Sequence, residues 1–209
     1  MTREIGWAGA FNARDLGGLA LVGGGTTQFG RVIRSGRVEP ITSVGWRQAA
    51  EEGLRTIVDL RNAGERGRLP GDPALDRDAM LGVTVIECPI EDQADVEFMR
   101  RCGDLLSQPD CYPDDMDMFP SRLGAVFSTI GSSATPLLFH CSAGRDRTGL
   151  IACLLLRLNG VEPAAIVADY ADGVRGHRQA LADRGLVDVD TTGEEEAARR
   201  VEFLDEWIG

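Results

Sequence analysis

The sequence contains no lysine: all 22 basic residues are arginine, against 33 acidic residues, and the net charge is −11. A surface this acidic disfavours nonspecific binding to nucleic acids or to anionic membranes. No hydrophobic run reaches the ~18 residues that a membrane span needs, and the longest lies at 151–156. The first residues also lack the basic start and hydrophobic stretch of a secretion signal. We therefore expect a cytoplasmic protein without an integral membrane segment, although signal-independent secretion stays open.

Cysteine and histidine are also scarce. The chain has two histidines and five cysteines, which are Cys88, Cys102, Cys111, Cys141 and Cys153. Their number is odd, and they form neither CxxC pairs nor a Cys/His cluster with zinc-ligand spacing. This pattern argues against a disulfide scaffold and favours buried or reactive thiols in a reducing compartment. We expect neither a metal nor a cofactor.

Hydrophobic patterning predicts strands that alternate with helices. Two short strands joined by a turn are expected between residues 11 and 36, with buried strands at 56–60, 83–86 and 137–139. Helices are expected at 43–52 with a Ser43 cap, at 95–106, 115–130 and 148–158, and toward the end at 194–207. This order is typical of an α/β sandwich in which helices flank a mostly parallel sheet. We expect residues 1–209 to form a single domain, with C-terminal helices at about 163–208.

The segment that carries chemistry lies between the strand at 137–139 and the helix at 148–158. It runs through His140, Cys141, Ser142, Ala143, Gly144, Arg145, Asp146, Arg147, Thr148 and Gly149. A strand–loop–helix junction directs successive backbone N–H groups and a helix N-terminus to one point, which makes an anion site. The same field favours the thiolate of a cysteine at its floor. The segment therefore predicts a nucleophilic cysteine beneath a bound phosphate.

Each neighbour of Cys141 has an expected role. Arg147 can fold back and hold two phosphate oxygens in a bidentate fork, and Thr148 can donate its hydroxyl to the thiolate. Gly144 lets the loop curl tightly, and His140 is expected to orient the loop. Ser142, Ala143, Gly144, Arg145, Asp146 and Arg147 are the expected phosphate-binding residues. The structural alternative makes Cys141 a buried thiol and Arg147 a solvated helix residue.

This signature, HCxxGxxR(S/T), resembles that of the cysteine-dependent protein tyrosine phosphatases. Residues 12–18 (NARDLGG) are similar to the NFRDLGG element of the atypical bacterial and fungal members, and further matches occur at 58–66, 88–92, 160–161 and 169–170. The resemblance covers about residues 11–172 and implies a tyrosine-phosphatase-like fold with a cysteinyl-phosphate intermediate. That group usually has HCxxGKDRTG, so Arg145 replaces a lysine, and a planar fork replaces a point charge. Ala13 in place of phenylalanine is a second departure.

The reaction also needs a carboxylic acid that protonates the leaving oxygen. Asp92 is the first candidate, because the resembling dual-specificity phosphatases carry their acid on a loop after a strand. Its alternative role is the cap of the helix that starts near Asp95. Asp146 is the second candidate, because the atypical group also has aspartate there, and its alternative role is an ion pair with a loop arginine. Both carboxylates can share acid and base duties.

In the resembling group the segment at about 93–131 forms a helical lid, with a tyrosine at the place of Tyr112. Acidic residues Asp114, Asp115 and Asp117 on such a lid would repel multiply phosphorylated ligands, so phosphotyrosine-like substrates are favoured over phosphoinositides. An ordinary solvated helix face is the alternative.

Three further predictions concern single residues or small groups. Cys88 is a possible disulfide partner for Cys141, with an inert buried thiol as the alternative. His177 is expected to be exposed on a surface helix. Arg14 and Asp15 are expected to form one internal ion-pair set with Asp59 and Arg61.

Taken together, the residues predict a metal-independent phosphatase that acts on phosphotyrosine, with dual specificity possible. A phosphoinositide or an inositol or sugar phosphate is the alternative substrate, and a catalytically silent phosphate-binding adaptor is an alternative of another class. The expected partner is a phosphorylated protein or small phosphomonoester. No nucleic acid is expected, and no oligomeric state is predicted.

Overall fold

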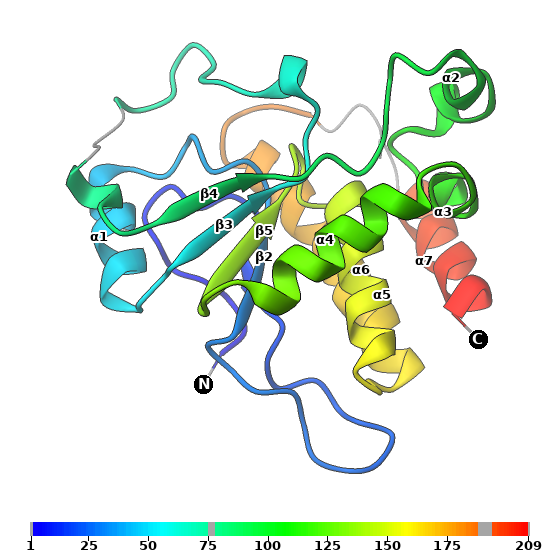
Figure 1. Cartoon of the computed structure of the whole chain (residues 1–209), viewed down its shortest axis with the longest axis horizontal. Helices are drawn as coiled ribbons and strands as arrows, with labels where there is room; N and C mark the ends of the chain where they lie inside the picture. Colours follow the sequence, from blue (N-terminus) through cyan, green and yellow to red (C-terminus); the bar gives the residue numbers. More distant parts are fainter. Residues whose placement is uncertain (1, 75–77, 188–193, 209) are drawn as a thin grey trace.

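The computed structural model describes residues 2–74, 78–187 and 194–208, and within them five strands form one sheet (Figure 1). The strands are β1 (Arg14–Asp15), β2 (Val32–Ser35), β3 (Thr56–Asp59), β4 (Thr84–Glu87) and β5 (Leu137–His140), in the order β1-β2-β5-β3-β4. Only the short β1 pairs antiparallel, with β2, and every other pair is parallel. The predicted mostly parallel sheet is confirmed. β5, which leads into the cysteine segment, is its central strand.

Helices cover both faces of the sheet (Figure 1). They are α1 (Ser43–Glu51), α2 (Val96–Cys102), α3 (Tyr112–Met118), α4 (Pro120–Ser132), α5 (Asp146–Leu158), α6 (Pro163–Ala182) and α7 (Glu194–Ile208). α1 packs on one face, and α4, α5 and α6 lie on the other, where α7 adds to the same core. The expected α/β sandwich is therefore present. No helix in the described parts of the chain has the length and hydrophobicity that crossing a membrane requires.

Strand residues alternate between the two cores. Leu137 and Phe139 of β5 pack toward α4 and α5, whereas Leu138 packs toward α1. A strand that is covered on both faces reads as a continuous hydrophobic run, which explains the sequence pattern at 137–139. The expectation of a buried strand at 83–86 was wrong, because β4 is an edge strand and Val85 is 52% exposed.

The starts and ends of three helices differ from the prediction. Thr42, not Ser43, caps α1, and its Oγ1 accepts from the backbone N–H of Gly45 at 3.2 Å. The helix expected at 95–106 gives way to a 3₁₀ turn at Gly103–Leu105. The helix expected at 115–130 is divided at Phe119, because Pro120 begins a new helix.

A disulfide joins Cys102 at the end of α2 to Cys111, which lies just before α3. Both sulfurs are buried beside Phe98, in a small hydrophobic cluster separate from the two cores. The expectation of unpaired thiols is therefore wrong for these two cysteines, because the turns at 103–111 bring positions nine residues apart to a Cα–Cα distance of 5.7 Å. Because these two cysteines are bonded, they do not support the expectation of a reducing compartment.

The double variant Cys102→Ala/Cys111→Ala tests the disulfide. Removing a bond that closes so short a loop should lower the free energy of unfolding by about 2–3 kcal/mol, measured by urea denaturation. Reductant should destabilise the wild-type protein by a similar amount and leave the double variant unchanged. Equal stability of oxidised and reduced wild-type protein would show that the bond does not form.

Candidate active site

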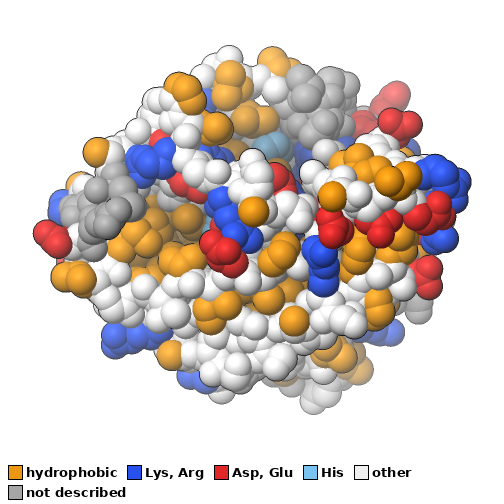
Figure 2. Space-filling view, turned by 45° about the horizontal axis from the view of Figure 1, so that its top comes forward, with side chains coloured by type: hydrophobic (Ala, Val, Ile, Leu, Met, Phe, Trp, Pro, Cys, Tyr) orange, Lys and Arg blue, Asp and Glu red, His pale blue; other side chains and the backbone are white. Residues whose placement is uncertain are grey.

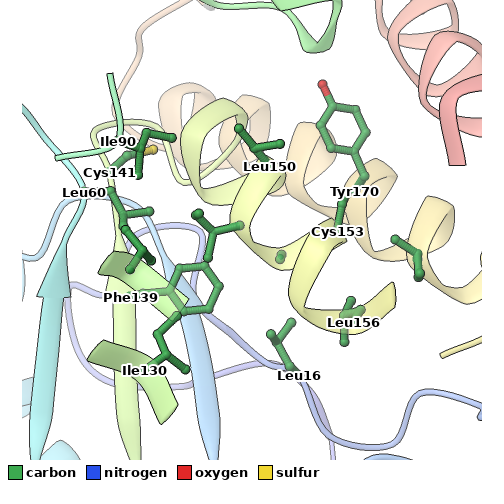
Figure 3. Close-up of a cluster of buried hydrophobic side chains, with 14 of the residues drawn as sticks. Leu16, Leu60, Ile90, Ile130, Phe139, Cys141, Leu150, Cys153, Leu156 and Tyr170 are labelled. Atoms are coloured by element: carbon green, nitrogen blue, oxygen red, sulfur yellow. The ribbon is translucent and has the colours of Figure 1, made fainter. Parts of the chain in front are cut away.

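The cysteine loop, residues 141–147, lies at the carboxyl end of β5 and continues into α5. Cys141 is 2% exposed and sits at the loop's floor, where hydrophobic side chains surround its base. Figure 3 shows it beside Ile90 and Leu60, above Phe139 of β5 and facing Leu150 of α5. Parallel strands end at the same edge of a sheet, so the segments after β3 and β4 also reach this site.

Four successive carbonyl groups of the loop are bound from outside it. His140 Nδ1 lies 3.0 Å from the Cys141 carbonyl oxygen, which can only accept, so this nitrogen carries a proton. The other three donors are the Arg37 backbone N–H to Ser142 O (3.0 Å), Asn12 Nδ2 to Ala143 O (3.0 Å) and Arg34 Nη2 to Gly144 O (3.0 Å). In a trans peptide the following N–H points the opposite way. The N–H groups of residues 142–145 therefore face inward and form a cradle for an anion.

Two backbone conformations make this cradle possible. Asn12 has φ +50°, which asparagine tolerates better than most residues, and this places its amide against the loop. Gly144 has φ +69°, and a Cβ there would lie 2.4 Å from the backbone nitrogen of Gly36. The predicted need for glycine at 144 thus follows from both its conformation and the close approach of the β2 end.

A buried ion-pair network holds Arg34 in place. Its guanidinium is fully buried and pairs with Asp169 of α6, which is 1% exposed and also pairs with Arg3. Arg14 donates to Asn12 Oδ1 at 2.7 Å and lies 4.0 Å from the Asp169 carboxylate. Burial would raise the pKa of Asp169, but the three arginines hold it below its usual value. Asp169 therefore stays charged and fixes two of the groups that position the loop.

The expectation of one ion-pair set containing Arg14, Asp15, Asp59 and Arg61 was wrong. Arg14 belongs to the Asp169 network, whereas the carboxylate of Asp15 accepts from the backbone N–H groups of Gly17 and Gly30 at 2.6 and 2.7 Å. Asp59 and Arg61 form a separate pair, 2.8 Å apart. The sequence alone does not show which of several distant, oppositely charged residues will pair with each other.

The immediate neighbours of the Cys141 sulfur agree with the predicted roles. Thr148 Oγ1 donates to Cys141 Sγ at 3.1 Å. His140 is buried, and its Nε2 lies 3.8 Å from Asp59. Burial lowers the pKa of His140 against the pull of that carboxylate, so the imidazole is neutral at neutral pH and serves as a fixed donor to the loop.

Arg147 reaches over the loop from the start of α5. Both terminal nitrogens pair with Glu65, which the 58–66 segment supplies, and Nη1 lies 3.5 Å from Glu91. Burial opposes the charge of Arg147, but its bonds to Glu65 raise its pKa well above the usual value. Glu65 binds the two terminal nitrogens of the guanidinium, so the side of the guanidinium that carries Nε remains available to a phosphate. The sequence predicted no role for Glu65, although residues 58–66, which contain it, match an element of the resembling group.

Arg145 and Asp146 face each other at the other side of the loop. Arg145 Nε donates to both Asp146 oxygens at 3.0 and 3.1 Å, and the Arg145 side chain is buried. Arg200 of α7 also pairs with Asp146, at 3.3 Å, and Tyr112 donates to the Asp146 carbonyl oxygen at 2.8 Å. The Arg145 guanidinium therefore fixes Asp146, and the Arg145 backbone N–H belongs to the cradle.

Asp92 turns away from the cysteine loop. Its carboxylate accepts from Arg122 Nη2 of α4 at 2.7 Å and from the backbone N–H of Ala94 at 3.0 Å. The preceding residue, Glu91, lines the cavity above Cys141 and is 3% exposed. Asp95, not Asp92, caps α2. The segment after β4 thus presents Glu91 to the cavity in place of the predicted Asp92.

The cavity above Cys141 has a volume of about 460 Å³. Its charged lining includes Arg37, Arg145, Arg147, Arg184, Glu65, Glu91 and Asp146, and its hydrophobic lining includes Phe11, Leu69, Leu106, Leu181 and Leu186. His177 also lines it and is buried against Phe11, with ring centroids 5.6 Å apart, so the expectation of an exposed His177 was wrong. α6 packs over the loop, and this turns His177 inward.

The acidic residues of the expected lid do not line this cavity. Asp114 and Asp117 pair with Arg101 of α2 on the exterior, and Asp115 is buried under the helix. α4 belongs to the main core, where Leu123, Val126 and Ile130 are buried. Of the segment at 93–131, Gln93 and the turn between α2 and α3, through Leu106 and Ser107, line the cavity. These three aspartates are therefore not placed to repel a phosphoinositide bound above Cys141.

Asp115 is 4% exposed, and its Oδ1 has no hydrogen-bond partner among the described residues. Burial and the nearby Glu91 raise its pKa to about 8. Asp115 is therefore a neutral acid at pH 7, mainly because its carboxyl group is buried.

Cys88 and Cys141 are both unpaired thiols, and the considered disulfide between them is not formed. Cys88 Sγ lies 3.8 Å from the Thr129 hydroxyl of α4. This contact agrees with the alternative, a buried structural thiol.

Asp169→Asn should remove about 3–5 kcal/mol from the free energy of unfolding at pH 7, because Arg34 would be left buried without its counter-charge. The folded pKa lies below the ordinary 3.8, so the stabilisation is complete above that value and is lost as the pH falls further. Urea denaturation at pH 7 measures the loss. Asp172→Asn, which alters a half-exposed carboxylate of the same helix, is the control and should cost less than about 1 kcal/mol.

Asp115→Asn tests the buried acid by the pH dependence of stability. The folded pKa of about 8 exceeds the ordinary 3.8, so the wild-type protein should lose stability relative to the variant as the pH rises between these values. The difference should change by about 1.4 kcal/mol per pH unit near pH 6, measured by urea denaturation from pH 5 to 9. A constant difference across this range would mean that Asp115 is ionised in the folded protein.

Comparison with known proteins agrees with this geometry. The model of the tyrosine phosphatase family matches residues 5–201. The chain is 34% identical over 173 residues to a Cupriavidus necator protein provisionally named a tyrosine-protein phosphatase, covering 80% of this chain and 62% of that protein. It is 32% identical over 141 residues to a tyrosine-protein phosphatase of Nostoc commune, covering 66% and 47%.

A third relative is the triple specificity protein phosphatase PtpB of Mycobacterium tuberculosis, 27% identical over 186 residues, with 78% of this chain and 66% of that protein covered. The chain thus spans between about half and two thirds of the length of these relatives. The matched residues include the cysteine loop, Asn12, Arg34 and Asp169. This chain belongs to the tyrosine phosphatase family.

Proposed function

We propose that this protein hydrolyses phosphomonoesters through a phosphate covalently bound to Cys141. The observation that carries the proposal is the set of four outward-bound carbonyls, which leaves four inward N–H groups above a cysteine sulfur. Preorganised N–H donors stabilise the negative charge that develops on a transferring phosphoryl group, and they need no rearrangement during the reaction.

The proposed first step forms a bond between Cys141 Sγ and phosphorus while the bond from phosphorus to the leaving oxygen breaks. A carboxylic acid in the cavity gives its proton to that oxygen. The N–H groups of residues 142–145 and the Nε edge of Arg147 hold the equatorial oxygens. Thr148, which donates to the sulfur, stabilises the thiolate when it departs in the second step. The loop amides and Arg147 supply the positive charge, so we propose that the reaction needs no metal.

The cavity favours an aryl phosphate, as in phosphotyrosine. Phe11, Leu106, Leu181 and Leu186 give it a hydrophobic wall beside the phosphate site, and a ring can pack there. The basic residues of the cavity are accompanied by the carboxylates of Glu65 and Asp146, which disfavour a second phosphate close to the first. The face seen in Figure 2 mixes acidic and basic side chains without an extended patch of one sign, which also disfavours a strongly anionic surface as partner.

Hydrolysis of a phosphotyrosine peptide and of phosphatidylinositol monophosphate, each with EDTA present, tests this proposal. We expect the wild-type protein to release phosphate from the peptide, with a kcat/KM at least tenfold higher than for the lipid. Cys141→Ser should be inactive on both, because its hydroxyl is not ionised at neutral pH.

Cys153→Ser is the matched control, since that thiol is buried in α5 away from the cavity, and it should keep activity on the peptide. Binding of phosphotyrosine without turnover would favour the phosphate-binding adaptor. Faster hydrolysis of the lipid would make a phosphoinositide the substrate class.

A further inference from the structure

We infer that Glu91 is the general acid of the first step and the general base of the second. This inference rests on the proposed function, because it assigns a catalytic residue to the same reaction. Neither Asp92 nor Asp146, the two carboxylates that the sequence favours, has a side chain as well placed and as available for proton transfer.

Glu91 lies where a leaving group must pass. It follows β4, and its carboxyl group lines the cavity that contains Cys141, with Oε1 3.5 Å from Nη1 of Arg147. Because Arg147 holds the phosphate in the proposed reaction, a group this close to its guanidinium is also close to the ester oxygen. Asp92 is excluded from that position by its bonds to Arg122 and to the Ala94 N–H.

The backbone and side chain of Glu91 are both fixed. Arg122 Nη1 donates to the Glu91 carbonyl oxygen at 2.5 Å, and Gln93 Nε2 donates to Glu91 Oε1 at 2.8 Å. These contacts leave Glu91 Oε2 to carry the proton. A fixed acid avoids the entropic cost of ordering a mobile side chain in the transition state.

Of the three carboxyl groups that line the cavity, Glu91 has the weakest compensation by cations. Glu65 is gripped by both terminal nitrogens of Arg147, and Asp146 pairs with both Arg145 and Arg200. Glu91 meets one guanidinium nitrogen at 3.5 Å. Close arginine partners favour the ionised form of a carboxylate, and the bonds from Arg147 hold the pKa of Glu65 below its usual value although burial opposes this.

The electrostatic surroundings of Glu91 favour its protonated form. Burial raises its pKa, and the negative charges of Glu65 and Asp146 add to the shift, while Arg147 and the Gln93 amide act against it. Asp115 of α3 also lies within electrostatic reach but is neutral below about pH 8. A bound phosphate brings further negative charge and strengthens the same preference.

The proton balance closes over the two steps. The Glu91 carboxyl proton moves to the leaving oxygen as the Sγ–phosphorus bond forms, which leaves a carboxylate. In the second step that carboxylate takes a proton from water, the water oxygen bonds to phosphorus, and the bond from phosphorus to Sγ breaks. The Cys141 thiolate and the Glu91 acid are then restored, and inorganic phosphate is released.

The leaving-group dependence of kcat/KM tests this role, because an acid matters most when the leaving oxygen is strongly basic. Phenyl phosphate and 4-nitrophenyl phosphate differ in this property and fit the same cavity. Glu91→Gln should lower kcat/KM for phenyl phosphate by about 10²–10³-fold and for 4-nitrophenyl phosphate at least about tenfold less. The pH profile should also lose the decline at high pH that marks deprotonation of an acid.

Asp92→Asn and Asp146→Asn are made in parallel and should keep the wild-type ratio between the two substrates. Glu91→Gln should be at least as stable to urea as the wild-type protein at pH 7, because it removes a buried carboxyl whose ionisation burial opposes. A merely structural Glu91 would give a less stable variant with equal losses on both substrates.

The inference is overturned if Glu91→Gln keeps the wild-type substrate ratio, or if Asp92→Asn or Asp146→Asn changes it. Failure of the proposed function looks different, because the wild-type protein would then hydrolyse neither substrate. If activity requires Cys141 but Glu91→Gln keeps the wild-type ratio of kcat/KM between the two substrates, the proposed function stands and only the role of Glu91 is rejected.

Discussion

The outward direction of four successive carbonyl groups, those of residues 141–144, determines what the cysteine loop can bind. In planar trans peptides the following N–H groups then point inward. The hydrogen bonds to the carbonyl groups outside the loop therefore create the anion-binding cradle inside it. The bonds come from three parts of the chain: His140, Asn12, and the segment that contains Arg34 and the Arg37 backbone. Arg34 depends in turn on Asp169 of α6. A buried carboxylate far along the sequence thus holds part of the phosphate site.

The protein is strongly acidic, yet its site is built for an anion. The two facts are compatible because backbone dipoles and one arginine act at short range, whereas net charge is screened over about 10 Å at moderate salt. The acidic residues of the site have different roles. Glu65 directs Arg147, Asp146 is held by Arg145 and Arg200, and Glu91 remains the least compensated of the three. Arginine at every cationic position suits such bidentate pairing.

The sequence predicted the elements that depend on local pattern. The central strand, the buried helix after it and the positions of Cys141, Arg147 and Thr148 all follow from a contiguous motif. It did not predict Asn12, Arg34 and Asp169 as supports of the loop, because the contacts from Asn12 to the loop, from Arg34 to the loop and from Arg34 to Asp169 each join residues more than 100 positions apart. Asp92 and Glu91 are adjacent, and only the path of the chain after β4 decides which one faces Cys141. The Cys102–Cys111 bond likewise depends on turns that Cys spacing does not reveal.

The central claim is that phosphate passes through a covalent bond to Cys141. Rapid acid quench of the wild-type protein during turnover of 4-nitrophenyl phosphate, followed by intact-mass and peptide analysis, tests it most directly. We expect the mass of one phosphoryl group to appear on the peptide that contains Cys141 and to disappear when substrate is exhausted. Turnover in the Cys141→Ser variant, or a phosphoryl group on another residue in place of Cys141, would contradict the account.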